Sequence, residues 1–254
     1  MANFAVIFPA AGKSSRYRDK EKKPFVNLDG RAVWLRSVEQ FITRTDVVQN
    51  IIVVSPDDQE MFRRRFGANL VFMNIQIANG GSERFESVAN ALAMLKLEVD
   101  FVAVHDAVRP CVTESLIAGV FAQAEKTGAA MLAVPVSDTV KQVDQQKHVK
   151  ATVSRQGLWL AQTPQVFRRD WLVEAYENRD RLGANFTDDA QLIEATGRTV
   201  HVVEGATTNI KITTKHDIFL ADAILKSLPK PKPTGPVYPF AEEEMWGGKG
   251  LKGN

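Results

Sequence analysis

Hydrophobic and polar positions along the chain follow two alternating patterns. Short apolar runs bounded by turn residues are typical of buried strands, and stretches in which apolar residues recur every three or four positions are typical of helices. We expect strands at Phe4–Phe8, Asn50–Val54, Leu70–Met73, Phe101–Val104 and Ala130–Val134. We expect helices near Val33–Thr43, Asp57–Phe66, Glu83–Lys96, Glu114–Lys126 and His216–Ser227. This alternation predicts the α/β class: a three-layer sandwich around a mostly parallel, twisted, Rossmann-like sheet with right-handed crossovers.

The stretch 139–154 departs from this alternation. We interpret it as two short strands, Thr139–Val143 and Val149–Val153, around a polar turn at Asp144–Lys147. A two-stranded hairpin that cannot bury itself is marginally stable alone, and such a hairpin commonly packs on another subunit. We therefore expect a protruding β-hairpin arm that joins two copies of the chain into a homodimer.

The segment 229–254 has a different composition from the rest of the chain. Five prolines between Pro229 and Pro239, the acidic run Glu242–Glu244 and the glycines from Gly247 onward argue against a packed helix or strand. We expect an extended or disordered tail there. The remaining residues, 1–228, are expected to form a single domain into which the arm 139–154 is inserted.

Charge and composition exclude several classes of protein. The 32 lysines and arginines against 30 aspartates and glutamates give a net charge of +2. Because no basic stripe is present, we expect no nucleic-acid partner. The single cysteine, Cys111, excludes an intrachain disulfide. No apolar run is long enough to span a bilayer and no signal peptide is recognisable, so we expect no membrane partner and a cytoplasmic protein.

The first predicted strand runs directly into a loop of small and cationic residues, Pro9-Ala10-Ala11-Gly12-Lys13-Ser14-Ser15-Arg16. Ligands of open α/β sheets bind at the carboxyl ends of the strands. There, small side chains let a nucleotide approach the main chain, and Lys13 and Arg16 offer positive charge to phosphates. The loop is not a Walker A motif, because Ile7 occupies the position of that motif's first glycine, and it lacks the three glycines of the dinucleotide fingerprint. The loop predicts a site for a nucleoside triphosphate; an ordinary solvated surface loop is the alternative.

Two further motifs suggest ligand chemistry. Asp106 follows directly on the predicted strand Phe101–Val104. A carboxylate beside bound phosphates suits Mg²⁺, which typically takes one or two carboxylates together with phosphate oxygens and water. The alternative is that Asp106 caps a turn and pairs with Arg109. Gly80 and Gly81 precede the third predicted helix and permit close approach of a base or an anion, or they serve plain turn chemistry.

Polar residues late in the chain complete the set of candidates. Lys211 stands between Ile210 and Ile212, and it therefore points away from the face that these isoleucines bury. That direction leads either to solvent or into a cleft. Arg155 and Thr163 are polar groups among apolar neighbours.

Taken together and in this order, these motifs resemble the 2-C-methyl-D-erythritol 4-phosphate cytidylyltransferase family of the non-mevalonate isoprenoid pathway. The resemblance runs from about Phe4 to Leu228 and leaves out the tail. It rests on eight segments: Pro9–Gly12 with Arg16 and Lys23, Gly80-Gly81 with Arg84 and Ser87, His105–Pro110, Pro135–Thr139, Arg155 with Gly157–Trp159, Thr163–Gln165, Thr187-Asp188 and Asn209–Thr213.

The resemblance implies a nucleotidyltransferase-type fold and a specific reaction. Members transfer CMP from CTP to the phosphate of methylerythritol phosphate and release pyrophosphate with a divalent metal such as Mg²⁺. They are homodimers in which each active site borrows residues from the partner's arm. By position, Arg16, Lys23 and Lys211 would be catalytic, and Asp106 would serve the metal and the ribose. The nucleotide would contact Pro9, Ala10, Ala11, Gly12, Lys13, Gly80, Gly81, Ser87, Asp106 and Ala107. The acceptor, a small polyol phosphate, would contact Thr139, Arg155, Thr163 and Arg109.

The sequence departs from the family pattern at Ser14, Lys22-Lys23-Pro24, Ser82 and Val108. Ser82 stands where the family often has aspartate, so it bears on how the base or ribose is held. The nearest alternative is a sister cytidylyltransferase that uses ribitol 5-phosphate. The Ala10-Ala11-Gly12 loop favours the isoprenoid enzyme, since the ribitol branch tends to have a glycine pair there. A non-catalytic nucleotide-binding protein on the same fold is the second alternative.

Overall fold

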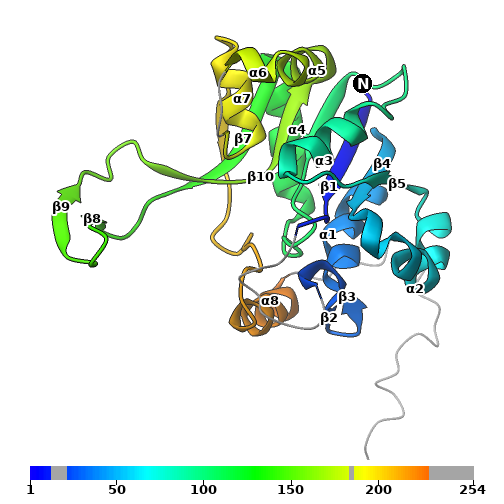
Figure 1. Ribbon diagram of the computed structural model, residues 1–254, viewed down its shortest axis with the longest axis horizontal. Helices are drawn as coiled ribbons and strands as arrows, with labels where there is room; N and C mark the ends of the chain where they lie inside the picture. The colour runs from blue at the N-terminus through cyan, green and yellow to red at the C-terminus, as the bar shows by residue number, and fades with distance from the viewer. Residues whose placement is uncertain (13–21, 183–185, 229–254) are drawn as a thin grey trace, which may run out of the picture.

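The computed structural model describes residues 1–12, 22–182 and 186–228, and its centre is one seven-stranded sheet (Figure 1). In spatial order the strands are β11 (His201–Glu204), β7 (Ala129–Pro135), β10 (Trp159–Arg168), β6 (Phe101–Val104), β1 (Phe4–Pro9), β4 (Val47–Val54) and β5 (Ile75–Asn79). All of them run parallel except β10, which is antiparallel to both of its neighbours. The prediction of a mostly parallel α/β sheet is confirmed.

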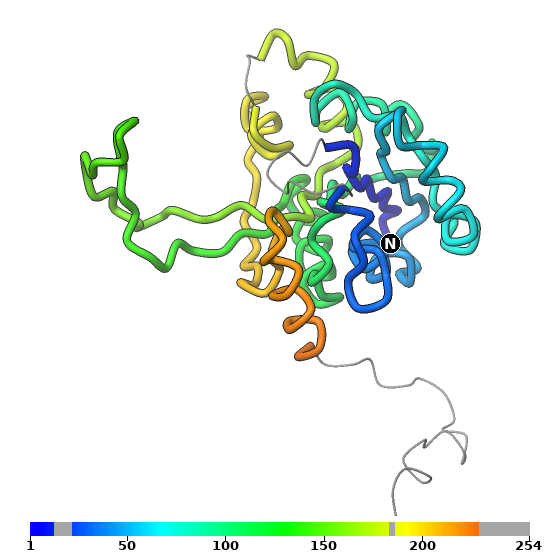
Figure 2. The backbone as a smooth tube through the Cα atoms, turned by 60° about the horizontal axis from the view of Figure 1, so that its bottom comes forward, coloured from blue at the N-terminus to red at the C-terminus, as the bar shows by residue number. Residues whose placement is uncertain are grey.

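Helices cover both faces of this sheet, as the three-layer prediction requires (Figure 1). One face carries α1 (Val33–Ile42), α2 (Gln59–Phe72) and α4 (Glu114–Thr127). The other carries α3 (Arg84–Leu92), α5 (Arg169–Glu177) and α7 (Asp189–Ala195). The short α6 (Arg179–Leu182) follows α5. The last helix, α8 (His216–Ser227), lies beside the small hairpin of β2 (Asn27–Leu28) and β3 (Arg31–Ala32) (Figure 2).

The side chains of β1 show why a central strand needs a continuous apolar run. Phe4, Val6 and Phe8 pack with the helices of one face, and Ala5 and Ile7 pack with those of the other. Successive residues of a strand point to opposite sides of the sheet, so a strand covered on both faces is apolar throughout. Fully burying one such large side chain contributes about 1.5–3 kcal/mol. The core therefore fixes where β1 ends and where its loop begins.

The predicted strand at Leu70–Met73 is wrong. These residues form the last turn and the C-cap of α2, and the strand begins later, as β5 at Ile75. Leu70 packs in the core, whereas Phe72 is 90 % exposed. Asn74, whose φ of 49° is left-handed, separates the helix from the strand. A short apolar run suits either a helix or a strand, and periodicity alone cannot separate the two.

The sequence patterns do not predict β10, although it lies inside the sheet. Its apolar run is interrupted by three buried polar side chains, Gln162, Thr163 and Gln165. Burying polar groups is costly unless they form hydrogen bonds, and all three do. The apolar pattern therefore fails to predict this strand, because hydrogen-bonded polar residues occupy buried positions at which apolar residues are expected.

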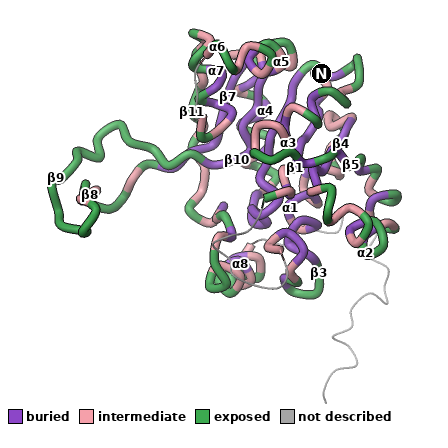
Figure 3. The backbone as a smooth tube through the Cα atoms, in the orientation of Figure 1, coloured by how far each residue is buried: buried purple, intermediate pink, exposed green. Residues whose placement is uncertain are grey.

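The segment 139–154 contains an antiparallel hairpin of β8 (Val140–Val143) and β9 (Val149–Val153), which pairs with no strand of the large sheet. It projects from the rest of the molecule (Figure 1), and nearly all of its residues are exposed (Figure 3). Val143 and Val149 are 49 % and 62 % exposed. Apolar side chains on a hairpin without its own core are typical of a surface that another chain covers. The role of this arm in dimerisation stays a prediction.

The division of the chain at residue 228 also stays a prediction, because 229–254 lie outside the described residues. Among the helices that are described, none has the length and apolar character that crossing a membrane requires. A cytoplasmic location stays a prediction.

Candidate active site

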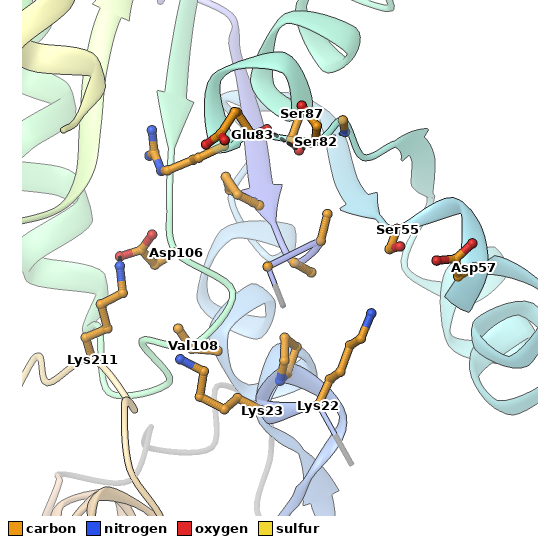
Figure 4. Close-up of a pocket in the computed structure, with 17 residues that line it drawn as sticks. Lys22, Lys23, Ser55, Asp57, Ser82, Glu83, Ser87, Asp106, Val108 and Lys211 are labelled. Carbon is orange, nitrogen blue, oxygen red and sulfur yellow. Dashed lines mark hydrogen bonds and ion pairs between the residues drawn. The ribbon is translucent and has the colours of Figure 1, made fainter. Parts of the chain in front are cut away.

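A cavity of about 370 Å³ opens at the carboxyl ends of β1, β4, β5 and β6 (Figure 4). Parallel strands bring their carboxyl ends to one edge of a sheet, so loops from distant parts of the sequence meet there. The walls come from Pro9–Gly12 after β1, Lys22–Pro24, the turn with Ser55 and Asp57, the entry to α3 at Gly81–Arg84 with Ser87, and Asp106, Val108 and Lys211.

The loop after β1 packs directly against the glycine pair after β5. A Cβ atom at Gly80 would lie 2.4 Å from the Cβ of Ala11, and one at Gly81 would lie 2.3 Å from the Cβ of Glu86. Such distances are far below van der Waals contact, so only glycine lets these segments approach so closely. Both ends of the contact are held by β4, because Ala10 N–H donates to the Val53 carbonyl and Gly80 N–H to that of Val54. Gly80 supports the cavity from behind, whereas Gly81 lines it.

The N-terminus of α3 is closed by its own side chains. The carboxylate of Glu86 accepts hydrogen bonds from the N–H groups of Ser82 at 2.6 Å and Glu83 at 3.2 Å. Ser87 Oγ accepts from Gly81 N–H at 3.0 Å and donates to the Glu83 carbonyl at 3.0 Å. A helix N-terminus can bind an anion when its N–H groups are open. Because Glu86 already occupies these donors, this wall suits a flat, polar base better than a phosphate.

Asp106 is the electrostatic centre of the opposite wall. Its Oδ2 lies 2.9 Å from Lys211 Nζ and 3.3 Å from Arg109 Nε. Burial opposes ionisation of the carboxyl, but the positive charges of Lys211, Arg84 and Arg109 outweigh it and lower the pKa of Asp106 well below its ordinary value. The ionised carboxylate therefore holds the Lys211 ammonium at the cavity wall (Figure 4).

Lys211 reaches the cavity because its neighbours are anchored. Ile212 is fully buried in the cluster that α8 forms with Leu28 and Val108, and Ile212 N–H donates to the Val108 carbonyl at 2.9 Å. The Asn209 carbonyl accepts from Arg109 Nη1 at 2.7 Å. Of the two directions that the sequence left open for this lysine, it takes the one into the cleft.

Lys22 and Lys23 form the cationic lower side of the cavity in Figure 4. Lys23 begins a 3-10 turn whose other residues, Pro24 and Phe25, are buried. The burial of Phe25 fixes the position of the turn against the core. Lys22 Nζ pairs with Asp58 at 2.5 Å. With Lys211 across the cavity, these lysines make a region in which a triphosphate would be attracted.

Arg84 joins the cavity to a buried group of residues on α5 and α7. Its Nη2 lies 2.7 Å from Asp189 Oδ2, and the Tyr176 hydroxyl donates to Asp189 Oδ1 at 2.5 Å. Burial disfavours the charged guanidinium, but Asp189 more than compensates and raises the pKa of Arg84. Arg84 is thus a permanent cation whose charge also acts on Asp106.

Several residues predicted for the site do not line this cavity. Thr163 and Arg109 are buried behind Asp106, as is Ala107. Thr139 and Arg155 are exposed at the arm. The Arg155 guanidinium donates to the Ser137 carbonyl. Lys13 and Arg16 lie outside the described residues.

Eight lining residues are not among the site residues predicted from the sequence: Lys22, Pro24, Ser55, Asp57, Ser82, Glu83, Arg84 and Val108. Ser55 and Asp57 stand just after the predicted strand Asn50–Val54, and the same rule that selected Asp106 would have found them. Arg84 belongs to a motif of the resemblance, but nothing in its local sequence indicates that it turns toward Asp189.

The described residues offer limited support for a metal ion. They contain no group of three or more His, Cys, Asp or Glu side chains that could hold one. Asp106 supplies one carboxylate, and its Oδ2 is already paired with the charged side chains of Arg109 and Lys211. Mg²⁺ commonly uses one or two carboxylates, with phosphate oxygens and water completing the shell. The residues therefore fit Mg²⁺ only when bound phosphates supply most of its ligands.

The fold and this cavity define an α/β nucleotidyltransferase: a mostly parallel sheet whose carboxyl edge joins a glycine-lined wall to a cationic one. The chain belongs to the 2-C-methyl-D-erythritol 4-phosphate cytidylyltransferase (IspD) family, whose model matches residues 4–227.

Similar proteins cover nearly the whole described chain. The 2-C-methyl-D-erythritol 4-phosphate cytidylyltransferase of Rhodopirellula baltica is 40 % identical over 235 residues, which are 88 % of this chain and 95 % of that protein. The one of Desulforamulus reducens is 37 % identical over 227 residues, 89 % of this chain and 97 % of that protein. Among solved structures, 4-diphosphocytidyl-2C-methyl-D-erythritol synthase from Anaerococcus prevotii matches with a TM-score of 0.76 at 30 % identity, covering 89 % of this chain and 96 % of its own. The Francisella tularensis cytidylyltransferase matches with a TM-score of 0.73 at 33 % identity and covers 88 % of this chain and all of its own.

Proposed function

We propose that the protein transfers CMP from CTP to 2-C-methyl-D-erythritol 4-phosphate in the synthesis of isoprenoid precursors. The products are 4-diphosphocytidyl-2-C-methyl-D-erythritol and pyrophosphate. The observation that carries this proposal is the Asp106–Lys211 pair, which holds an ammonium group at 2.9 Å from a buried carboxylate on the wall of the cavity. Membership of the cytidylyltransferase family supports the choice of nucleotide and acceptor.

The chemistry asks for cations rather than for a strong base. An oxygen of the acceptor's phosphate forms a bond to the α-phosphorus of CTP, and the bond from that phosphorus to the pyrophosphate oxygen breaks in line. A phosphate monoester dianion is already deprotonated, so no side chain has to remove a proton. The protein must bring two anions together and stabilise the charge of the transition state, which positioned cations do. Lys23 and Lys211 line the cavity, which supports assigning this role to them. Arg16 is assigned the same role from its position in the family motif.

The two walls of the cavity give CTP an orientation. The wall at Gly81 and Ser87 has its amide donors satisfied internally and suits the cytosine. The lysines on the other side suit the triphosphate. Asp106, which is paired with Lys211 on that wall, would face the ribose.

We also propose that the reaction uses a divalent cation. Mg²⁺ suits this site because it typically binds one or two carboxylates together with phosphate oxygens and water. When bound it would neutralise phosphate charge, with Asp106 as the protein carboxylate nearest to it. The charges of Lys211 and Arg109 keep Asp106 ionised and hence available as a ligand.

The arm gives a reason to propose a homodimer. Thr139 and Arg155 are exposed and do not line the cavity of their own chain, so they would bind the acceptor's phosphate in the cavity of a second copy. Exposed apolar residues at the root of the arm, Trp159 at 44 % and Leu160 at 58 %, provide surface that a partner could cover. In this arrangement each active site uses Lys211 of one chain and Arg155 of the other.

The direct test is an assay with CTP labelled at the α-phosphate, Mg²⁺ and either methylerythritol phosphate or ribitol 5-phosphate. We expect label in a cytidine diphosphate adduct of methylerythritol, with equimolar pyrophosphate, and no more than trace product with ribitol phosphate. Preferred use of ribitol phosphate would favour the sister enzyme. Binding of CTP without release of its pyrophosphate, whichever acceptor is offered, would favour a non-catalytic nucleotide-binding protein.

A further inference from the structure

His105 lies immediately before Asp106 but faces away from the cavity. Its side chain is fully buried, and its ring packs against Phe41 with centroids 4.9 Å apart and against the edge of Phe8 at 6.2 Å. It does not line the cavity. Nothing in the proposed reaction uses this ring, yet a polar group buried among aromatic rings needs its hydrogen bonds satisfied.

The partners of the ring fix which nitrogen carries the proton. His105 Nε2 lies 3.1 Å from the Arg109 carbonyl oxygen, which can only accept, so Nε2 carries the hydrogen. In a neutral ring Nδ1 is then an acceptor, and it lies 3.2 Å from Thr163 Oγ1, which donates to it. Burial lowers the pKa of His105 to about 4, so the ring is neutral near pH 7.

The hydroxyl of Thr163 passes this constraint on to Asp106. With its proton committed to His105, Thr163 Oγ1 accepts the hydrogen bond from Asp106 N–H at 3.0 Å. Hydrogen bonds therefore run in one direction from Asp106 N–H through Thr163 and His105 to the Arg109 carbonyl. A direct bond from Arg109 N–H to the Asp106 carbonyl, 3.0 Å long, closes the same loop. This series of hydrogen bonds begins at Asp106 and ends at Arg109. The side chains of the same two residues form the ion pair between Asp106 Oδ2 and Arg109 Nε.

We propose that His105 is a positioning residue for nucleotidyl transfer: in its Nε2–H tautomer it orients the Thr163 hydroxyl, which holds the Asp106 backbone so that the carboxylate receives Lys211 in the cavity. This inference rests on the proposed function of the Asp106–Lys211 pair. His105 does not touch the reactants. Removing groups that act through a reactive residue in this way typically costs about 10–100-fold in activity.

The first part of the test needs no substrate. In the wild type, ¹⁵N NMR of the imidazole should show an unprotonated Nδ1 and a protonated Nε2, and hydrogen exchange at the Asp106 amide should be slow. In Thr163→Val that amide should exchange faster, while Thr163→Ser should restore protection because it keeps the hydroxyl. A protonated Nδ1, or unchanged Asp106 exchange in Thr163→Val, would overturn the proposal. Because these readouts do not involve CTP, they are informative even if the wild type fails to transfer CMP.

The second part compares turnover with stability. We expect His105→Phe and Thr163→Val each to lower kcat about 10–100-fold with a smaller change in the KM for CTP. The fold-decrease in kcat of the double variant should be much smaller than the product of the two single fold-decreases, because both substitutions interrupt the same series of hydrogen bonds. His105→Asn should retain more activity than His105→Phe, because the side-chain oxygen of asparagine can accept a hydrogen bond from Thr163. If His105→Phe does not fold, His105→Asn takes its place in the comparison.

The matched control is Gln49→Leu. Gln49 is also a buried polar residue, and it joins the Met94 carbonyl and Lys96 N–H at the opposite end of the sheet. This change should lower the free energy of unfolding while kcat stays near the wild-type value. If the His105 and Thr163 variants also keep wild-type kcat once the folded fraction is accounted for, or if their losses multiply in the double variant, His105 is structural only.

Discussion

At the scale of single residues, Lys211 owes its place to one carboxylate. The Lys211 side chain is 39 % exposed, whereas that of Asp106 is 9 % exposed. An exposed lysine near a surface is ordinarily mobile and gains little from pairing. Here the charges of Lys211, Arg84 and Arg109 lower the pKa of the buried Asp106 well below its ordinary value, so the carboxylate is ionised near neutral pH. It therefore holds the ammonium group where the negative charge of the reaction would develop.

We therefore expect Lys211→Met and Lys23→Ala each to lower kcat by about 10²–10³-fold, which is the usual loss when one charge-stabilising donor is removed. We expect a similar decrease in kcat for Arg16→Ala, because Arg16 belongs to the same family motif as Lys23. Steady-state kinetics with CTP and methylerythritol phosphate check this, with Lys96→Ala, near the other end of β4, as a control that should retain activity. Near-normal turnover in the Lys23 and Lys211 variants would reject their assigned roles.

His105 gives the folded protein a characteristic response to acid. Its pKa is about 4 in the folded protein against an ordinary value of 6.5. Between these values the unfolded chain takes up a proton that the folded chain refuses, so stability falls as the pH drops through this window. The loss due to this group is about 3 kcal/mol. Urea unfolding of the wild type and of His105→Phe between pH 6.5 and 4 should show a steeper decline in the wild type. Parallel declines would contradict this assignment.

The residues at the site could be predicted to different extents. Asp106 follows from the rule that ligands bind at the carboxyl ends of strands, and Gly81 follows from a glycine pair that precedes a predicted helix. The direction of Lys211 could not be decided, because it depends on Ile212 packing against α8, a helix that only the tertiary structure places there. The hydrogen bonds of His105 were equally inaccessible, since Thr163 lies on β10, which the patterns do not predict.

At the scale of elements, the cavity depends on two loops that touch. Gly80 packs against Ala11, and this contact sets the width between the first loop and the entry to α3. Continuous apolar strands such as β1 and β6 could be predicted from sequence, whereas β10 and the true position of β5 could not. In β10, buried polar residues interrupt the apolar pattern that identifies a strand. Before β5, the apolar C-terminal turn of α2 has the same sequence pattern as a strand.

Replacing Gly80 with alanine should push these loops apart. The new methyl group would lie 2.4 Å from Ala11 Cβ, and overpacking of this kind costs about 1–3 kcal/mol. We expect a lower free energy of unfolding and a higher KM for CTP. Gly67→Ala is the matched control, because a Cβ there meets nothing within 4 Å in helix α2, and alanine should stabilise that helix by about 0.5–1 kcal/mol. An unchanged KM in Gly80→Ala would mean that the contact does not shape the nucleotide site.

At the scale of the whole molecule, the arm separates two groups of residues assigned to one reaction. Lys211 lines the cavity, whereas Arg155 directly follows the arm 139–154 in the sequence. The arm projects from the rest of the molecule (Figure 1). The hairpin itself could be predicted from its two short strands and polar turn. Its direction relative to the sheet could not, because no local pattern encodes how far an unpacked hairpin projects.

Mixing two inactive variants tests whether the arms are exchanged. Lys211→Met and Arg155→Ala dimers should each be nearly inactive. If subunits are exchanged, a mixed dimer contains one site with both residues intact. An equal mixture should then recover about a quarter of wild-type activity, since half of the dimers are mixed and each has one intact site. No recovery, although mass spectrometry shows mixed dimers, would place Arg155 in the site of its own chain or outside it.

The proposed reaction requires that the cavity at the carboxyl edge of the sheet holds CTP in one orientation. The most direct measurement is a crystal structure of the protein with CTP. We predict the cytosine against Gly81 and Ser87, and the α-phosphate between Lys23 and Lys211. A nucleotide bound away from this edge, or one whose triphosphate lies against the closed N-terminus of α3, would contradict the account.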